Sequence, residues 1–294
     1  MSRCFSSDVF SSDFFRVNLR TGESSPGGAP SGQGVKQMKK TALDINCDLG
    51  ESFGVYTLGQ DEEILNLISS ANVACGFHAG DPHVMRKTVA LAKKKGVRVG
   101  AHPGLMDLLG FGRRTMQITP PELKDMVTYQ IGALKAFVEA AGMKLQHLLQ
   151  HGILTKMVEE DETLGRAILE SILEVDPGLL YVTLEGTYLP RKAKEMGIKI
   201  VKTAFADRAY DHKKRLVSRK IPGSVFHDMR RVEERIEQLV TTETITTIEG
   251  ETLPIEFDSI MLHGDSPDAL ELAKTVSSTL KRLGVQIKPM SELV

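Results

Sequence analysis

Residues that can carry protons recur in this chain directly after short runs of β-forming residues. The set comprises Asp48, Glu51, His78, His102, His151, Asp207, His263 and Asp265. In an α/β barrel the carboxyl ends of all strands open onto one rim, so side chains that are distant in sequence meet there. Carboxylates and imidazoles are the usual general acids and bases. The pattern therefore predicts an acid–base catalytic site on that rim.

A glycine-hinged loop, Gly110-Phe111-Gly112-Arg113-Arg114, adds two guanidinium groups. Arginine binds a carboxylate or phosphate in a planar fork, so Arg113 and Arg114 are candidates for holding an acidic substrate. Two exposed loop arginines are the equally weighted alternative. Asn46 and Arg208 complete the residues expected to bind substrate.

Each of these residues also has a plain structural explanation when it is taken alone. His102 before Pro103 could merely end a strand, and Asp265 could merely cap a helix. The joint placement at successive strand ends favours the catalytic interpretation. The remaining histidines lack this context: we expect His147 to be a satisfied core residue and the others to lie at the surface, namely His83, His212 and His227.

Several catalytic and nucleotide-binding motifs are absent from the sequence. It contains no GxxxxGK[ST] phosphate loop and no GxGxxG after a strand, so nucleotide use would require another structure or another subunit. It contains no GxSxG or HExxH either, which disfavours a serine hydrolase or a zincin. A divalent metal held by rim histidines and carboxylates stays open.

The elements that must position these residues alternate between β-rich runs and helical patterns, which is typical of βα units. Seven strands are predicted, at residues 41–48, 73–77, 97–101, 145–150, 179–184, 198–205 and 259–262. Helix starts are indicated by Asp81-Pro82, by a capping box at Thr119 and by Ser266-Pro267. Glycines 96, 142, 197 and 284 are expected to end helices.

The first strand alternates strictly, with Asp44, Asn46 and Asp48 on one face. Helices cover the outside of a barrel, so this polar face should point into the lumen. Residues 244–257 indicate a hairpin inserted near the end of the chain. The length from Met38 onward is close to the roughly 250 residues of an α/β barrel, so we predict a single barrel domain over residues 38–294.

Residues 1–37 hold eight serines and five glycines and cannot bury enough apolar surface to order themselves. We predict a disordered extension, either vector-derived or misassigned, ahead of a natural start at Met38. The 37 basic and 38 acidic residues leave no global field for nucleic acid, and no apolar run is long enough to span a membrane. Three cysteines without a CxxC pair favour a reducing, cytoplasmic location.

Longer motifs suggest a family. Their sequences are Asp44-Ile45-Asn46-Cys47-Asp48-Leu49-Gly50-Glu51, residues 71–82 (ANVACGFHAGDP), residues 100–104 (GAHPG), Phe111-Gly112-Arg113-Arg114, residues 205–210 (FADRAY) and His263-Gly264-Asp265. This series, in this order from about Thr41 to near the C-terminus, resembles the LamB/YcsF family.

The resemblance implies a seven-stranded β/α barrel similar to the glycoside hydrolase/deacetylase superfamily. It also implies a component of an ATP-dependent 5-oxoprolinase, which works with two further subunits to open the 5-oxoproline lactam to glutamate. ATP would then be handled with the partners. Within the site, a carboxylate or histidine would activate water and another histidine would protonate the ring nitrogen.

The chain departs from the family pattern at one place. The family usually has Lys-Pro-His-Gly and, after two further residues, a tyrosine, whereas this chain has Leu149-Gln150-His151-Gly152 followed by Ile153-Leu154-Thr155. The resemblance implies that the change removes a cation suited to holding phosphate or carboxylate. Two alternatives therefore stay open: a metal-dependent deacetylase or sugar hydrolase of the same barrel class, and a non-catalytic binding subunit.

Overall fold

Seven parallel strands close into a ring because the first of them pairs on both sides, with the second strand and with the last. The computed structural model describes residues 40–294, and the predicted extension 1–37 lies outside the described residues. The strands of the ring are β1 (Ala42–Leu49), β2 (Ser70–Ala74), β3 (Arg98–His102), β4 (Leu145–Leu148), β5 (Leu180–Thr183), β6 (Ile200–Phe205) and β9 (Ser259–Leu262). This ring confirms the predicted seven-stranded β/α barrel.

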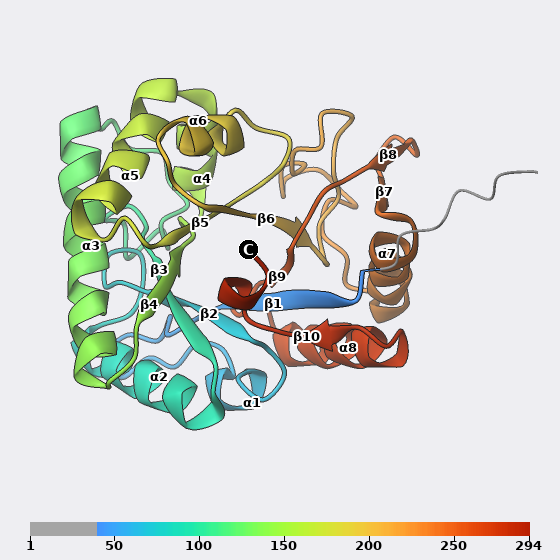
Figure 1. The fold of residues 1–294 in the computed structure, drawn as a ribbon, viewed down its shortest axis with the longest axis horizontal. Coiled ribbons are helices and arrows are strands. Elements are labelled where there is room, and N and C mark those ends of the chain that lie inside the picture. Colours follow the sequence, from blue (N-terminus) through green and yellow to red (C-terminus); the bar gives the residue numbers. More distant parts are fainter. Residues whose placement is uncertain (1–39) are drawn as a thin grey trace, which may run out of the picture. The chain divides into compact units, whose positions relative to one another are not determined.

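Helices surround the ring of strands (Figure 1). They are α1 (Asp61–Ile64), α2 (Pro82–Lys95), α3 (Pro120–Ala140), α4 (Ile153–Glu160), α5 (Glu162–Val175), α6 (Leu189–Glu195), α7 (Met229–Thr242) and α8 (Ala269–Arg282), with a short 3-10 helix η1 (Met290–Glu292) at the end. The long helix α3 shows why they pack there: its buried apolar residues recur every three or four positions and form one stripe. No helix among residues 40–294 combines the length and the apolar character needed to cross a bilayer.

Most of the predicted helix boundaries are confirmed. Asp81 accepts hydrogen bonds from the first backbone amides of α2, and Thr119 forms a reciprocal capping box with Glu122. Gly96 ends α2 in the left-handed conformation. The predicted start at Ser266-Pro267 is wrong, because α8 begins at Ala269 after Asp268 and has no side-chain cap. The carbonyl of Ser266 accepts from the Ala269 amide instead, so Ser266 is part of the turn that precedes the helix.

Two short elements lie outside the ring. Strands β7 (Thr244–Thr246) and β8 (Thr252–Pro254) pair antiparallel and confirm the predicted hairpin. Strand β10 (Gln286–Ile287), which the sequence pattern did not reveal, pairs in parallel with the start of β1. Because β10 leads into η1, the end of the chain is tied to the amino end of the ring.

The barrel interior is polar, as the alternation in β1 predicts. Asp44 accepts hydrogen bonds from the hydroxyls of Ser69 and Ser70 at 2.7 and 2.5 Å, and from Ser259. Asn46 donates to Ser259 Oγ at 2.7 Å. These groups are buried, so each hydrogen bond offsets the loss of water that burial imposes.

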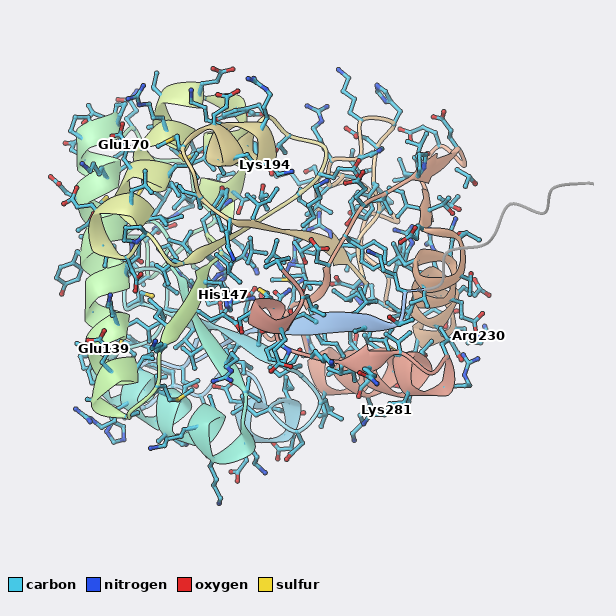
Figure 2. All side chains as sticks on the ribbon, in the orientation of Figure 1. Glu139, His147, Glu170, Lys194, Arg230 and Lys281 are labelled. Atoms are coloured by element: carbon cyan, nitrogen blue, oxygen red, sulfur yellow. The ribbon has the colours of Figure 1, made fainter. Side chains whose placement is uncertain are left out.

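His147 is a satisfied core residue, as predicted. It is labelled near the centre of Figure 2, whereas the labelled charged residues lie on the outer helices. Its Nε2 lies 2.7 Å from Asn72 Oδ1, and its Nδ1 lies 3.1 Å from the side-chain amide of Gln146. Its ring fits because the facing strand carries Gly100, where an added Cβ would lie 2.2 Å from the ring.

We predict that Gly100→Ala lowers the free energy of unfolding by about 1–3 kcal/mol or more, since the new methyl overpacks the interior. Gly132→Ala is the matched control, because Gly132 is exposed on α3 with no atom near the added Cβ. That change should stabilise by about 0.5–1 kcal/mol through helix propensity. Urea unfolding of the three proteins measures both values; equal effects of the two substitutions would contradict this packing account.

A second prediction concerns Asp44, whose pKa burial raises to about 6 despite hydrogen bonds from Ser259, Ser70 and Ser69. Ionisation is therefore harder in the folded than in the unfolded state, and the contribution of Asp44 to stability should decline as pH rises from about 4 through 6. Relative to Asp44→Asn, which does not titrate, the decline should approach about 3 kcal/mol at most.

Urea unfolding at several pH values between about 4.5 and 7.5 measures this decline. Asp125→Asn makes the same substitution on the exposed side of α3 and is the matched control. A difference between wild type and Asp44→Asn that stays constant with pH would refute the prediction.

Candidate active site

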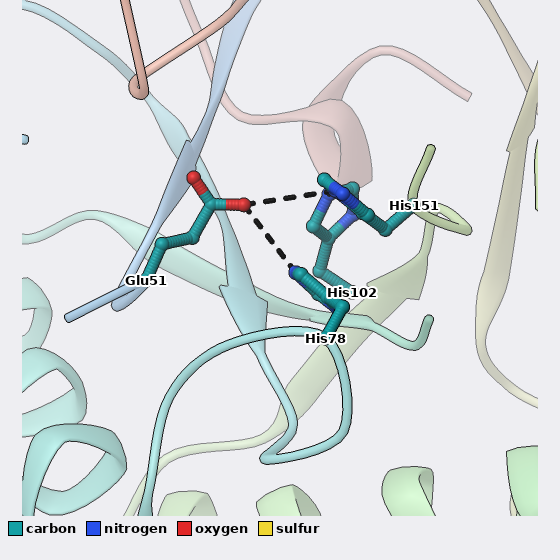
Figure 3. A group of neighbouring side chains, drawn as sticks. All are labelled: Glu51, His78, His102 and His151. Atoms are coloured by element: carbon teal, nitrogen blue, oxygen red, sulfur yellow. Dashed lines mark hydrogen bonds and ion pairs between the residues drawn. The ribbon is translucent and has the colours of Figure 1, made fainter. Parts of the chain in front are cut away.

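Four buried side chains from the carboxyl ends of β1 to β4 meet at one point. We call Glu51, His78, His102 and His151 the histidine cluster (Figure 3). One nitrogen or oxygen atom from each lies within 4.8 Å of the others. All four residues are buried, and Glu51, at 6% exposure, is the most accessible of them. The strand ends thus converge as the sequence predicted, and the four donors suit a divalent metal.

Hydrogen bonds to the backbone fix the tautomers of two of these histidines. His102 Nδ1 lies 2.6 Å from the carbonyl of Leu149, and His151 Nε2 lies 2.9 Å from the carbonyl of Phe111. A carbonyl only accepts, so both nitrogens must carry protons. The other nitrogens, His102 Nε2 and His151 Nδ1, then face each other at 3.0 Å.

Two neutral rings in these tautomers present lone pairs to each other, so the 3.0 Å contact requires a positive charge at that point. Either a proton on one ring or a metal ion satisfies it. Metal-bound histidines usually donate their second ring nitrogen to a carbonyl or a carboxylate, as both rings do here. The donor set, three imidazoles and a carboxylate, matches the ligands of zinc and related divalent ions.

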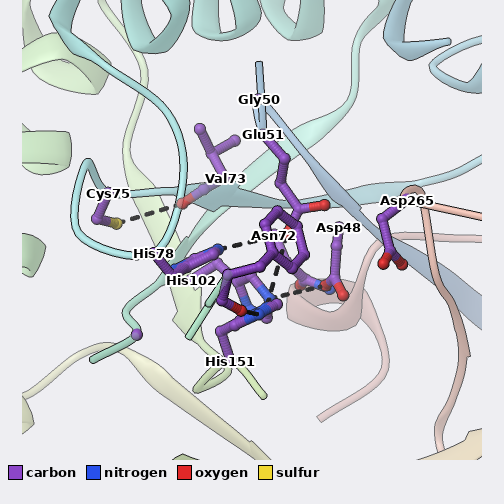
Figure 4. A network of polar contacts seen from close by, with 12 residues as sticks. Asp48, Gly50, Glu51, Asn72, Val73, Cys75, His78, His102, His151 and Asp265 are labelled. Atoms are coloured by element: carbon purple, nitrogen blue, oxygen red, sulfur yellow. Dashed lines mark hydrogen bonds and ion pairs between the residues drawn. The ribbon is translucent and has the colours of Figure 1, made fainter. Parts of the chain in front are cut away.

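Asp48 joins the cluster from the barrel interior (Figure 4). Its Oδ1 lies 3.2 Å from His102 Nε2 and accepts a 3.0 Å hydrogen bond from Asn72. Burial alone would raise the pKa of Asp48, but His102, His263 and His151 outweigh it and lower that pKa to about 2. Asp48 is therefore an anion that favours a cation at the cluster.

The other members of the histidine cluster are held in neutral form. Burial, and then the neighbouring Asp48, raise the pKa of Glu51 well above its usual range. Burial, and then the neighbouring histidines, lower the pKa of His78 far below its ordinary value and that of His151 to about 3. His78 Nε2 lies 3.3 Å from Glu51 Oε1, while its buried Nδ1 has no partner among the described residues.

A second acid–base pair lies on the other side of the mouth, after β6 and β9. His263 Nδ1 lies 3.1 Å from Asp207 Oδ2, so the carboxylate can hold the ring with Nε2 free for proton transfer. Burial raises the pKa of Asp207, but His263 and Arg208 outweigh it and lower the value overall. Asp207 is thus an anion in the folded protein.

The loop between β3 and α3 covers the histidine cluster. The Phe111 ring packs edge-on against His78 and His151, with centroids 5.7 and 5.0 Å apart. Arg113 lies over Phe111 and forms an ion pair with Asp265, Nη2 to Oδ2 at 2.5 Å. Asp265 follows β9, so this pair joins the two sides of the mouth.

The structure thus brings most of the predicted catalytic residues to one mouth. The predicted substrate-binding residues are spread more widely. Arg113 lies at the mouth, Arg114 pairs with Asp107 inside its own loop, and Arg208 donates to the carbonyls of Ser224 and Val217. Asn46 lies deeper in the barrel, bonded to Ser259.

Sequence reasoning missed three groups that orient the site. Asn72 holds Asp48, and the backbone carbonyls of Leu149 and Phe111 hold His102 and His151. A polar alternation in Ser70-Ala71-Asn72 could have revealed Asn72, but the predicted strand began only at Val73. Backbone carbonyls leave no signal in the residue types. Leu149 holds His102 through its backbone, so this contact does not depend on the side chain at position 149.

The fold and the site together define a class: a β/α-barrel protein whose mouth holds a buried set of imidazoles and carboxylates. The LamB/YcsF family matches residues 43–294, and the chain belongs to that family. It is 49% identical to the A subunit of 5-oxoprolinase from Pyrococcus furiosus over 252 residues, which cover 86% of this chain and 99% of the relative. The corresponding 5-oxoprolinase component of Clostridium beijerinckii is 47% identical, and the match covers 85% of this chain and 98% of that relative.

Solved structures agree with this placement. The lactam utilization protein from Thermus thermophilus superposes with a TM-score of 0.81 at 40% identity, covering 84% of this chain and 99% of that one. A putative cellobiose-phosphate cleavage protein from Enterococcus faecalis has a TM-score of 0.52 at 11% identity, covering 87% and 100%. The second likeness shows a shared fold only.

Proposed function

We propose that this chain is the component of an ATP-dependent 5-oxoprolinase that opens the 5-oxoproline lactam to glutamate by hydrolysis. The observation that carries the proposal is its 49% identity, over almost the full length of the relative, to a protein named as the A subunit of 5-oxoprolinase. The gathered acid–base residues at the barrel mouth support a hydrolytic role. The sequence similarity supports a component of that enzyme.

Ring opening needs three things from the protein. Water must lose a proton as it attacks the ring carbonyl, the carbonyl oxygen must be stabilised as charge develops on it, and the ring nitrogen must gain a proton as the C–N bond breaks. His263, held by Asp207, is placed to exchange a proton through its free Nε2. Asp48, which is anionic beside His102, is the candidate to receive the proton of water.

We further propose that the histidine cluster holds a divalent cation. The facing nitrogens of His102 and His151 and the neighbouring Asp48 anion support it. When bound, such a cation supplies Lewis acidity, which polarises a carbonyl oxygen or lowers the pKa of water. Glu51, His78, His102 and His151 would be its ligands, and the carbonyls of Leu149 and Phe111 would orient two of them.

ATP and the partner subunits belong to the same proposal. An unstrained amide resists water, so transfer of the terminal phosphate of ATP to its carbonyl oxygen, with release of ADP, is a sensible use of ATP. Water then opens the phosphorylated ring to an acyl phosphate, and a second water releases phosphate and leaves glutamate. The sequence has no phosphate-binding loop, and we assign the phosphate transfer to two further subunits. The names of the relatives designate one lettered component of an enzyme, which supports assembly with others. We also propose a cytoplasmic location, which the buried free thiols of Cys47 and Cys75 support.

Two alternatives give different results in the same assays. A metal-dependent deacetylase or sugar hydrolase, favoured by the ligand-like cluster, would act on acetylated sugars without ATP or partners. A non-catalytic binding subunit would leave ring opening to its partners. The non-catalytic alternative is based on the absence of a lysine at position 149. If the wild type is already highly active and Leu149→Lys does not change that activity, this alternative is refuted.

The first test reconstitutes the chain with its partner subunits, ATP and 5-oxoproline, and measures glutamate. We expect glutamate formation to depend on this chain, and His263→Gln to lower kcat by about 10²–10⁴-fold, the usual contribution of a general acid or base. His212→Gln makes the same change at an exposed position and should be neutral. Full activity in the absence of this chain would remove the proposal.

The second test measures bound metal. After treatment with chelator, the wild type and the exposed-site control His83→Ala should each bind one Zn²⁺ per chain in a titration followed by elemental analysis. His102→Ala should bind at least about tenfold more weakly, because it removes a ligand. Glu51→Gln, which replaces a ligand carboxyl group by an amide of nearly the same shape, should also weaken binding and guards against misfolding of the histidine variant. Equal binding by all four proteins would place the metal elsewhere.

A further inference from the structure

The loop that covers the histidine cluster is held across the mouth by one accessible ion pair. The Arg113 side chain is 39% exposed and that of Asp265 is 13% exposed, and a single nitrogen contacts a single oxygen. Exposed ion pairs of this kind are weak. Arginine can hold a carboxylate through two parallel hydrogen bonds, so this pair does not use the full capacity of Arg113.

The neighbouring pair within the same loop is built differently. Arg114 contacts both carboxylate oxygens of Asp107 through Nε and a third time through Nη2, and Asp107 is buried. The Asp107 carboxylate also accepts from the amide of Gly110. Asp107 and Arg114 therefore fix the base of the loop. Residues 110–113 are the part between these two anchors that reaches the histidine cluster, where the carbonyl of Gly112 also accepts from the amide of Ile153.

The backbone of this part is suited to a change of conformation. Phe111 has φ +53° and Gly112 has φ +60°, two successive residues in the left-handed region. For Phe111 this conformation is unfavourable. A Cβ at Gly112 would lie 2.8 Å from His78 and 2.9 Å from His151, so only glycine allows the loop to lie this close to the cluster.

The covered site must open for a substrate to enter. His78 is fully buried, and His102 and His151 are nearly so. The Phe111 ring and carbonyl contact these histidines from the mouth side, with Arg113 over the ring. Residues 110–113 are thus the part of the loop whose movement exposes the cluster.

We propose that residues 110–113 are a gate, that the Arg113–Asp265 pair is the latch that closes it, and that the carboxylate of the lactam substrate takes the place of Asp265 on Arg113. The substrate then binds through the group that closes the gate over it. This inference rests on the proposed function for the identity of the ligand, an α-carboxylate on a five-membered lactam. The latch itself is a property of the chain alone.

The two partners of the latch then have opposite effects on substrate binding. Asp265 competes with the substrate for Arg113, so Asp265→Asn should lower KM for 5-oxoproline by about threefold or more, whatever happens to kcat. Arg113→Gln removes the group that binds the substrate, so KM should rise about tenfold or more. A purely structural tie would shift KM in the same direction in both variants.

Hydrogen–deuterium exchange tests the gate without turnover. The amides of Phe111, Gly112 and Arg113 all bond to carbonyls within the loop. We expect Asp265→Asn and Arg113→Gln to speed exchange in residues 108–115 several-fold. Glu170→Gln is the matched control, because it breaks the exposed Arg166–Glu170 pair far from the mouth in sequence. Unchanged exchange in both latch variants would overturn the gate.

Ligands separate recognition of the carboxylate from recognition of the ring. Added 5-oxoproline should slow exchange of residues 108–115 in the wild type and in Asp265→Asn but not in Arg113→Gln. The lactam 2-pyrrolidinone, which lacks the carboxylate, should slow it in none of them. Equal effects of the two lactams, or KM shifts of the same sign, would overturn the exchange of partners on Arg113.

The experiments also separate this inference from the function on which it rests. If the reconstituted enzyme forms no glutamate, the proposed function fails, while exchange in the ligand-free variants still decides whether the latch exists. If glutamate forms but the latch variants behave like the wild type in both assays, the function stands and the gate is refuted.

Discussion

Two imidazole nitrogens that face each other inside the mouth impose the main electrostatic constraint on this structure. His102 Nε2 and His151 Nδ1 lie 3.0 Å apart, and backbone carbonyls occupy the opposite nitrogen of each ring. Such a contact is repulsive between neutral rings and needs a cation. The anionic Asp48, 3.2 Å from His102, supplies the compensating charge. The mouth is therefore built around a positive charge among buried side chains, where electrostatic interactions are strong.

This constraint also links the cluster to the loop above it. The carbonyl that orients His151 belongs to Phe111, the same residue whose ring covers His78 and His151. Opening of the loop would therefore free a ring nitrogen as well as expose the cluster. The carbonyl that orients His102 belongs to Leu149, at the end of β4. Because that contact uses the backbone, the residue type at 149 can change without altering how His102 is held.

Most of the strands and the position of the mouth could be predicted from the sequence, and the elements that were missed have physical explanations. Strict alternation in β1 identified its inward face, and polar residues after most strands located the mouth. The predicted start of β2, at Val73, is three residues too late, because Ser70 and Asn72 are polar. Composition alone does not reveal a strand whose polar residues are paired inside a barrel. The two-residue β10 is too short to carry a periodicity.

The sequence also did not predict that the site has two halves, the histidine cluster on one side of the mouth and the Asp207–His263 pair on the other. Strand order places β9 between β6 and β1, so His263 faces Asp207 and lies across the mouth from His102. The partners of the arginines were also hidden. Arg113 and Arg114 are adjacent and of the same type, yet one pairs across the mouth with Asp265 and the other within its loop with Asp107. Only the loop geometry, with its left-handed turn at Phe111 and Gly112, separates them.

The polar interior explains how the mouth is held rigid from below. α/β-barrel interiors are ordinarily filled with branched apolar side chains. Here a directional chain of hydrogen bonds begins at the Ser291 hydroxyl in η1, which donates to Gln146, and continues through His147 and Asn72 to Asp48. Each group in this chain accepts from the group before it and donates to the group after it. A flip of a single amide or imidazole would therefore put a donor against a donor or an acceptor against an acceptor, and would leave a buried group unpaired. An apolar interior would pack as well, but it would leave Asp48 without the donor that aims it at His102.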